Sequence, residues 1–370
     1  MMRIGIFSFF LFLCINNVYS WTAQEDDEKY QRCSVISMMI EHPMYLFNDE
    51  IADAFRRIPL SARFNNHNLG VRVVKFATQE YTDQTASILS FIKQIHLGTR
   101  TVAKWFNWNK ETGLFDMDMV RARGMYNANA LDYELASKRI LGNPILADAG
   151  EHLISQTYLV MSDICYKGKY SIKESNATKT GNRRRFDVSI TSYIFQLDWN
   201  EETLNSFYTD YWQGKHDFVQ SVNKYGFVYR GKVETDYSES SAKFTQSELI
   251  ERVVARSIDI NFAKLQKVYP DFRIKALLIS DNPIQADIGL KEGVIETDLY
   301  EVLEKSVDEK GIAKYTRVGI IRPIKGMIWD NRYGAEIDNS IESKLGYTTF
   351  EKVSGGDFYP GMYIREIKSK

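Results

Sequence analysis

The chain has 370 residues, of which 44% are hydrophobic and 26% are charged. Its 47 Lys and Arg residues nearly balance its 48 Asp and Glu residues, and the charges are spread along the sequence. Nucleic-acid-binding proteins carry a clustered basic face, so no nucleic-acid partner is expected. The length and the hydrophobic share are those of a globular protein with two or three domains.

The first twenty residues have the three regions of a secretory signal peptide. Arg3 gives a positive start, an apolar run covers residues 4–15, and Val18 and Ser20 are small enough for the −3 and −1 positions. This run is shorter than the roughly 20 residues that a membrane-spanning helix needs. We therefore predict cleavage after Ser20 and export of the mature chain, with a retained anchor as the alternative.

The positions of the three cysteines indicate whether a lipid anchor or a disulfide bond is expected. Cys14 lies within the signal peptide, and Leu13 before it is too large for the usual lipobox, so no lipid anchor is expected. Cys33 and Cys165 remain after cleavage. A disulfide between them would close a long loop and stabilise the chain by roughly 4 to 5 kcal/mol. Two cysteines are no disulfide framework, which favours two unpaired thiols, with Cys165 buried in a strand, over the disulfide.

Residues 21–270 predict an α/β body. Residues 29–58 are expected to be mostly helical, with a break at residues 42–43. Further helices are predicted at residues 83–98, 116–124, 129–141, 145–154, 201–222 and 245–269, and strands at residues 71–76, 157–166, 186–199 and 227–237. The strand at 186–199 carries apolar side chains on both faces, which indicates a central strand covered on both sides. Thr245 and Glu248 form a capping box at the start of the last helix.

The helical period stops after Pro270, and short strands alternate with turns. These strands are predicted at residues 274–280, 284–288, 299–304, 315–323 and 362–367, with a hairpin turn at 308–311. Regular short strands of this kind favour a small closed barrel over residues 271–370. The fold class predicted is therefore α+β, an α/β sandwich-type body followed by an all-β module.

The order of these elements resembles two known kinds of domain. The first resemblance is to the α/β domain shared by the curli-secretion channel lipoprotein and the TolB N-terminal domain. It rests on the strand at 71–76, the segment LGNPILADAG at 141–150 and the strands at 157–166 and 186–199. The module after 270, with GLKEG at 289–293, resembles the SH3-like barrel of flagellar assembly protein T, which joins the same two kinds of domain. The resemblance implies envelope assembly or scaffolding rather than catalysis.

Nearly all of the mature chain is similar to a set of uncharacterised exported proteins of Bacteroidales. The matching stretches are RGMYNA at 123–128, ADAGE at 147–151, IFQLDW at 194–199, IWDNR at 328–332 and SGGDFYPGM at 354–362. This resemblance implies export from a Gram-negative cell but no particular activity.

Asp148, Glu151 and His152 are the candidate catalytic group. At positions i, i+3 and i+4 of a helix they share one face, where they can hold a metal or act as acid and base. A metal-binding helix normally supplies two histidines four residues apart, and this one has a single histidine. The simpler interpretation is a short helix with Asp148 near its N-terminus. The other four histidines are far apart in sequence, so their spacing indicates no metal site, and no cofactor is expected.

Two groups are candidate interaction residues. Tyr208 and Trp212 follow one stripe of an aromatic helix and would form a partner or glycan platform if that stripe is exposed. Arg183, Arg184 and Arg185 are a triplet that can contact an acidic headgroup or a glycan, although such triplets are usually only solvated.

We expect a non-enzymatic envelope protein, located in the periplasm, at the outer membrane or outside the cell. It would be a scaffold or interaction component, with envelope proteins or further copies of itself as partners and with membrane association only through a partner. One alternative is a secreted hydrolase, with or without a metal, that uses Asp148, Glu151 and His152. The other is a glycan-binding surface protein that uses Trp212.

Overall fold

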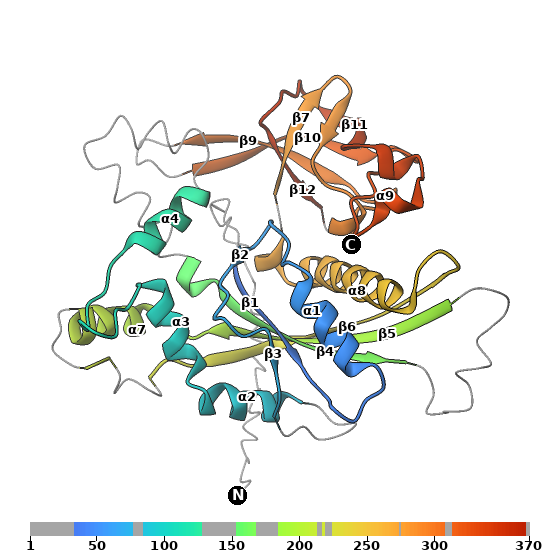
Figure 1. Cartoon of the computed structure of the whole chain (residues 1–370). Helices are drawn as coiled ribbons and strands as arrows, with labels where there is room; N and C mark the ends of the chain where they lie inside the picture. Colours follow the sequence, from blue (N-terminus) through green and yellow to red (C-terminus); the bar gives the residue numbers. More distant parts are fainter. Residues whose placement is uncertain are drawn as a thin grey trace, which may run out of the picture.

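The computed structural model describes residues 33–76, 84–127, 153–167, 184–212, 217–218, 224–273, 275–307 and 313–367. Figure 1 shows two parts: a body in which helices cover a mixed β-sheet, and a closed β-barrel formed by strands between residues 276 and 366. This arrangement confirms the predicted α+β class with a small barrel. The predicted signal peptide lies outside the described residues. No helix among the described residues is long and apolar enough to cross a membrane.

The sheet of the body has six strands, with β3 paired to β1 beside the path β2-β1-β4-β5-β6. The strands are β1 (Ser34–Ile40), β2 (Asn65–Asn66), β3 (Val73–Val74), β4 (Thr157–Tyr166), β5 (Arg184–Leu197) and β6 (Phe227–Ser241). β1 runs parallel to β2, β3 and β4, whereas the β4–β5 and β5–β6 pairs are antiparallel. The parallel half of the sheet places the carboxyl ends of β1 and β4 at the same edge.

The sequence-based prediction of helix over residues 29–58 was wrong in its first half, where β1 is a strand. Residues on both faces of β1 are buried: Ile36 and Met38 pack on one side and Val35 and Met39 on the other. A short apolar run that is buried on both faces has no period of two, so periodicity alone cannot separate it from a buried helix.

Helices cover both faces of the sheet. They are α1 (Asn48–Arg57), α2 (Thr85–Gln94), α3 (Leu97–Trp105), α4 (Asp118–Asn127), α7 (Glu201–Ser206), continued by a π-helical turn (Phe207–Trp212), and α8 (Gln246–Val268). α1 and α8 lie on the face nearer to the barrel, and α2 lies on the opposite face (Figure 1). The predicted capping box of α8 is confirmed, and β5 is the covered central strand that the sequence indicates.

The barrel closes in the order β10-β11-β8-β7-β12-β9, with every pair antiparallel. Its strands are β7 (Ala276–Asp281), β8 (Ile284–Ala286), β9 (Tyr300–Val307), β10 (Ala313–Pro323), β11 (Thr348–Gly355) and β12 (Tyr363–Glu366). β11 was not predicted, because only its first three residues are buried and the rest are exposed and mostly polar. A short 3-10 helix (Pro270–Phe272) connects α8 to the barrel.

Candidate functional site

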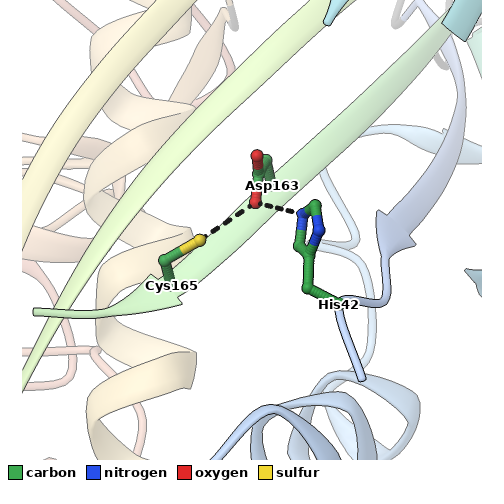
Figure 2. A group of neighbouring side chains, drawn as sticks. All are labelled: His42, Asp163 and Cys165. Carbon is green, nitrogen blue, oxygen red and sulfur yellow. Dashed lines mark hydrogen bonds and ion pairs between the residues drawn. The ribbon is translucent and has the colours of Figure 1, made fainter. Parts of the chain in front are cut away.

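His42, Asp163 and Cys165 meet where two parallel strands end (Figure 2). Ile40, the last residue of β1, is in register with Asp163 on β4, and His42 lies two residues beyond Ile40. Asp163 and Cys165 are also two residues apart on one strand, so their side chains point to the same face of the sheet. Ligand sites of α/β proteins form preferentially at the carboxyl ends of parallel strands.

The three side chains converge on one carboxylate oxygen. The Nε2 atom of His42 lies 3.0 Å from Oδ1 of Asp163. The Cys165 thiol donates to the same oxygen, with Sγ at 3.1 Å. The three potential ligand atoms all lie within 4.8 Å of one another. An imidazole, a carboxylate and a thiol therefore share one small volume at the edge of the sheet.

The chain around His42 is held by neighbouring groups. The backbone N–H of His42 donates to Oδ1 of Asn48 at 2.7 Å, and its ring stacks on Tyr45 at 4.5 Å. His42 is buried, whereas the Asp163 carboxylate keeps 17% of its surface exposed. The His42 imidazole is thus packed against Tyr45, whereas the Asp163 carboxylate is partly exposed to solvent.

The electrostatics of the group do not favour a cysteine nucleophile. Burial, reinforced by the charge of Asp163, raises the pKa of the Cys165 thiol well above its ordinary value. Reactive cysteines have a lowered pKa, because the thiolate is the nucleophile. His42 and Cys165 are both hydrogen-bonded to Asp163. The carboxylate therefore lies between the thiol and the imidazole that would have to act as its base. A metal ligand must also be a thiolate, and a cation bound among the three donor atoms would itself supply the positive charge that stabilises it.

A second feature is the junction between body and barrel. Arg252 and Arg256, one turn apart on α8, have side chains only 3% and 5% exposed. The Arg252 guanidinium pairs with Glu239 of β6 at 2.7 Å and with Asp338 of the barrel. Arg256 pairs with the same two carboxylates, at 3.5 Å and 2.7 Å. The two carboxylates, one from each part of the protein, are joined by these buried cations.

A narrow crevice lies beside this junction, between α1, α8 and the 3-10 turn Leu290–Glu292. It has about 20 Å³ of open volume, room for about one water molecule. Asp259 of α8 lines it, with Lys291 at 3.7 Å. Burial raises the pKa of Asp259 to about 6; nearby Glu292 adds to the shift and Lys291 opposes it. The crevice is too small for an organic ligand.

Tyr208 and Trp212, the predicted platform, are half-buried and belong to an aromatic cluster. The Tyr208 ring lies 6.0 Å from the ring of Phe106, and Trp212 stacks on Phe115 at 6.0 Å. Most of their surface therefore packs within the body.

The other sequence-predicted residues are placed as follows. Arg184 and Arg185 are exposed at the start of β5, where Arg184 donates to the carbonyl of Phe244 and Arg185 pairs with Asp187. Arg183 lies outside the described residues. So do Asp148, Glu151 and His152, and their catalytic role remains a prediction.

The disulfide candidate Cys33–Cys165 is wrong, since both cysteines are free. Cys33 precedes β1 at one end of the β1–β4 pair, opposite Gln156 by the register of the next residues, and Cys165 lies near the other end of β4. At about 3.3 Å per residue along a strand, the two thiols are on the order of 30 Å apart. A disulfide needs Cα atoms within about 7 Å.

Sequence reasoning missed His42 as a site residue, because it placed residues 29–58 in helices rather than at the end of a strand. The one available signal was the segment Asp163–Cys165 in a predicted strand, a carboxylate and a thiol on one face. None of the known family models matches this sequence, and no curated protein matches it significantly.

Proposed function

We propose that this chain is a non-catalytic component of the cell envelope and serves as a scaffold in a larger complex. The observation that carries the proposal is a segment of the chain that has several exposed apolar side chains and is held to the body by buried ion pairs. Location in the cell envelope is inferred from the first twenty residues of the sequence, which have the pattern of a cleaved signal peptide.

This segment lies between β10 and β11 of the barrel and contains the helix α9 (Ala335–Asp338). Its exposed apolar side chains are Met327, Tyr333, Ile337, Ile341 and Tyr347. Ile337 and Ile341 are 51% and 75% exposed. Exposed apolar groups gathered in one segment are typical of protein–protein contact surfaces. We call this segment, residues 327–347, the apolar segment.

Asp338 anchors the apolar segment, because it is the barrel carboxylate that Arg252 and Arg256 bind. Arg252 also donates to the carbonyl of Gly334, and Arg256 to that of Tyr333. The segment is thus held to α8 of the body by four contacts at its centre. A contact surface that is held in this way can position a partner relative to the whole molecule, which is what a scaffold requires.

The test is the size of the native complex. Detergent extracts of cells that express the tagged protein are separated by native electrophoresis, with the wild-type chain compared to an Ile337→Asp/Ile341→Asp double variant. We expect the wild-type protein in an assembly well above the 42.9 kDa of the chain. The double variant should run as a single chain, because two charges on the contact surface oppose its burial.

The matched control is Leu114→Asp, which places a charge at another exposed apolar residue, 66% exposed, in the body. This variant should stay in the assembly. A wild-type protein that runs as a single chain in every extract would contradict the scaffold proposal. An assembly that keeps the Ile337→Asp/Ile341→Asp variant would show that the apolar segment is not its contact surface.

A further inference from the structure

We propose that His42, Asp163 and Cys165 form a binding site for a divalent transition-metal ion of the zinc type. The proposal goes beyond the scaffold function and does not depend on it. It rests on the positions of three donor atoms that come from two strands and meet within 4.8 Å.

The donor atoms are those that zinc prefers. Zn²⁺ is bound by Cys sulfur at about 2.3 Å, by His nitrogen at about 2.0–2.1 Å and by carboxylate oxygen at about 2.0–2.2 Å. Ligand atoms at these distances around a tetrahedral ion lie roughly 3.3–3.7 Å from one another. Here the His42 and Cys165 donor atoms lie 3.0 Å and 3.1 Å from the Asp163 oxygen. Small side-chain rotations would therefore be enough to admit an ion.

Binding replaces two hydrogen bonds with three metal–ligand bonds. The Cys165 thiol gives its proton to solvent. The Nε2 proton that His42 donates to Asp163 also leaves, by exchange through solvent to the tautomer that carries the proton on Nδ1, so that Nε2 can bind the ion. The carboxylate and the thiolate together carry two negative charges, which neutralise a divalent cation. Metal ligation by cysteine releases protons in this way.

The site also has a route to solvent and a pre-positioned ligand. The Asp163 carboxylate is 17% exposed and Cys165 is half-buried, so an ion and a fourth, water ligand can enter from the edge of the sheet. His42 is held in place by Asn48 and Tyr45. Three protein ligands plus water is the arrangement of an open zinc site. A thiolate and an imidazole in one site select against Mg²⁺ and Ca²⁺, which take oxygen ligands.

The experiment measures Zn²⁺ binding to the mature chain by competition with a chromogenic chelator, after treatment with EDTA. We expect one tight site per chain. Cys165→Ser, which keeps a hydroxyl donor for Asp163, and His42→Gln should each weaken binding by at least about 100-fold, beyond the loss typical of removing an outer-shell partner. Cys33→Ala and His96→Asn should bind as the wild type does, because neither residue lies in the cluster.

Two further readouts use the wild-type chain and so do not depend on the folding of a variant. Co²⁺ should give a thiolate-to-metal charge-transfer band and the visible bands of a tetrahedral site. Zn²⁺ should protect Cys165 from alkylation, as measured by mass spectrometry, with Cys33 as the internal reference. Absence of the charge-transfer band, or alkylation of Cys165 at the same rate with and without Zn²⁺, would overturn the proposal. So would tight binding that survives in folded Cys165→Ser protein.

Discussion

A single carboxyl group near the junction of the two parts makes the stability of the protein depend on pH. Asp259 lies on the side of α8 that faces the turn carrying Lys291. Its pKa is raised from an ordinary value of 3.8 to about 6. A carboxyl group whose pKa is higher in the folded chain than in the unfolded chain binds its proton more tightly in the folded chain. Its contribution to stability is therefore greatest at acidic pH and is lost as the pH rises from about 4 to above 6.

Asp259→Asn should accordingly stabilise the protein at neutral pH. The shift of about two pKa units corresponds to up to about 3 kcal/mol in the free energy of unfolding at pH 7.5, and to less than about 1 kcal/mol at pH 4. Urea unfolding at the two pH values measures both numbers. The exposed Asp357→Asn serves as the control and should change neither. Equal effects of Asp259→Asn at both pH values would contradict the assignment.

At the scale of elements, α8 carries the contacts that join the sheet to the barrel. Arg252 lies with its side chain 3% exposed between Glu239 of β6 and Asp338 of α9. Removing one partner of a buried ion pair costs about 3 to 5 kcal/mol when the other is left uncompensated, and here Arg256 still pairs with both carboxylates. Asp338 keeps 35% of its side-chain surface exposed, so the lower end of this range applies.

Arg252→Ala should therefore lower the free energy of unfolding by about 3 kcal/mol. The control is Arg322→Ala, which removes a guanidinium–carboxylate pair with Glu351 in which both side chains are about half exposed. Exposed pairs contribute less than about 1 kcal/mol. Chemical denaturation of both variants measures the difference, and equal losses would mean that the junction does not depend on the buried pair.

The start of α3 shows how one glycine can mislead a sequence-based prediction. Gly98 was expected to end a helix that begins at Asp83, but the helix breaks earlier and Gly98 lies inside α3. A Cβ atom at this position would come within 2.1 Å of the carbonyl oxygen of Tyr225. The glycine is needed because another part of the backbone passes against the helix, a contact between residues far apart in sequence.

On the scale of the whole molecule, the connection between body and barrel is itself part of the core. Phe272 of the connecting turn is 1% exposed and packs on Tyr158 and Phe64. The Tyr158 hydroxyl donates to Asp271 at 2.6 Å. A connection that is buried in this way leaves the two parts little freedom to move independently, consistent with a scaffold that holds a fixed shape.

Phe272→Ala should loosen this connection and cost about 3 to 5 kcal/mol. Arg273 and Lys275 are then expected to become accessible, so brief trypsin treatment should cut between body and barrel in the variant but not in the wild type. Phe358→Ala, a similar truncation in the core of the barrel, is the control. If both variants release the same fragments at the same rate, the cleavage reflects general unfolding rather than the connection.

Features that depend on local patterns could be predicted from the amino-acid sequence. The alternation of residues 186–199 placed β5 at the centre of the sheet, the Thr245–Glu248 capping box began α8, and short strands after Pro270 indicated the barrel. These features follow from the spacing of apolar side chains and from hydrogen bonds between residues close in sequence.

The sites, in contrast, depend on contacts between residues that are far apart in the sequence. His42 and Asp163 are separated by 121 positions, and Arg252 and Asp338 by 86. Each pair meets because of strand register or helix packing, neither of which leaves a periodic signal in the sequence. The strand β1 was itself missed, since burial on both faces removes the alternation that marks a strand. The metal site proposed for His42, Asp163 and Cys165 thus depends on the parallel pairing of β1 with β4, a contact that the fold supplies.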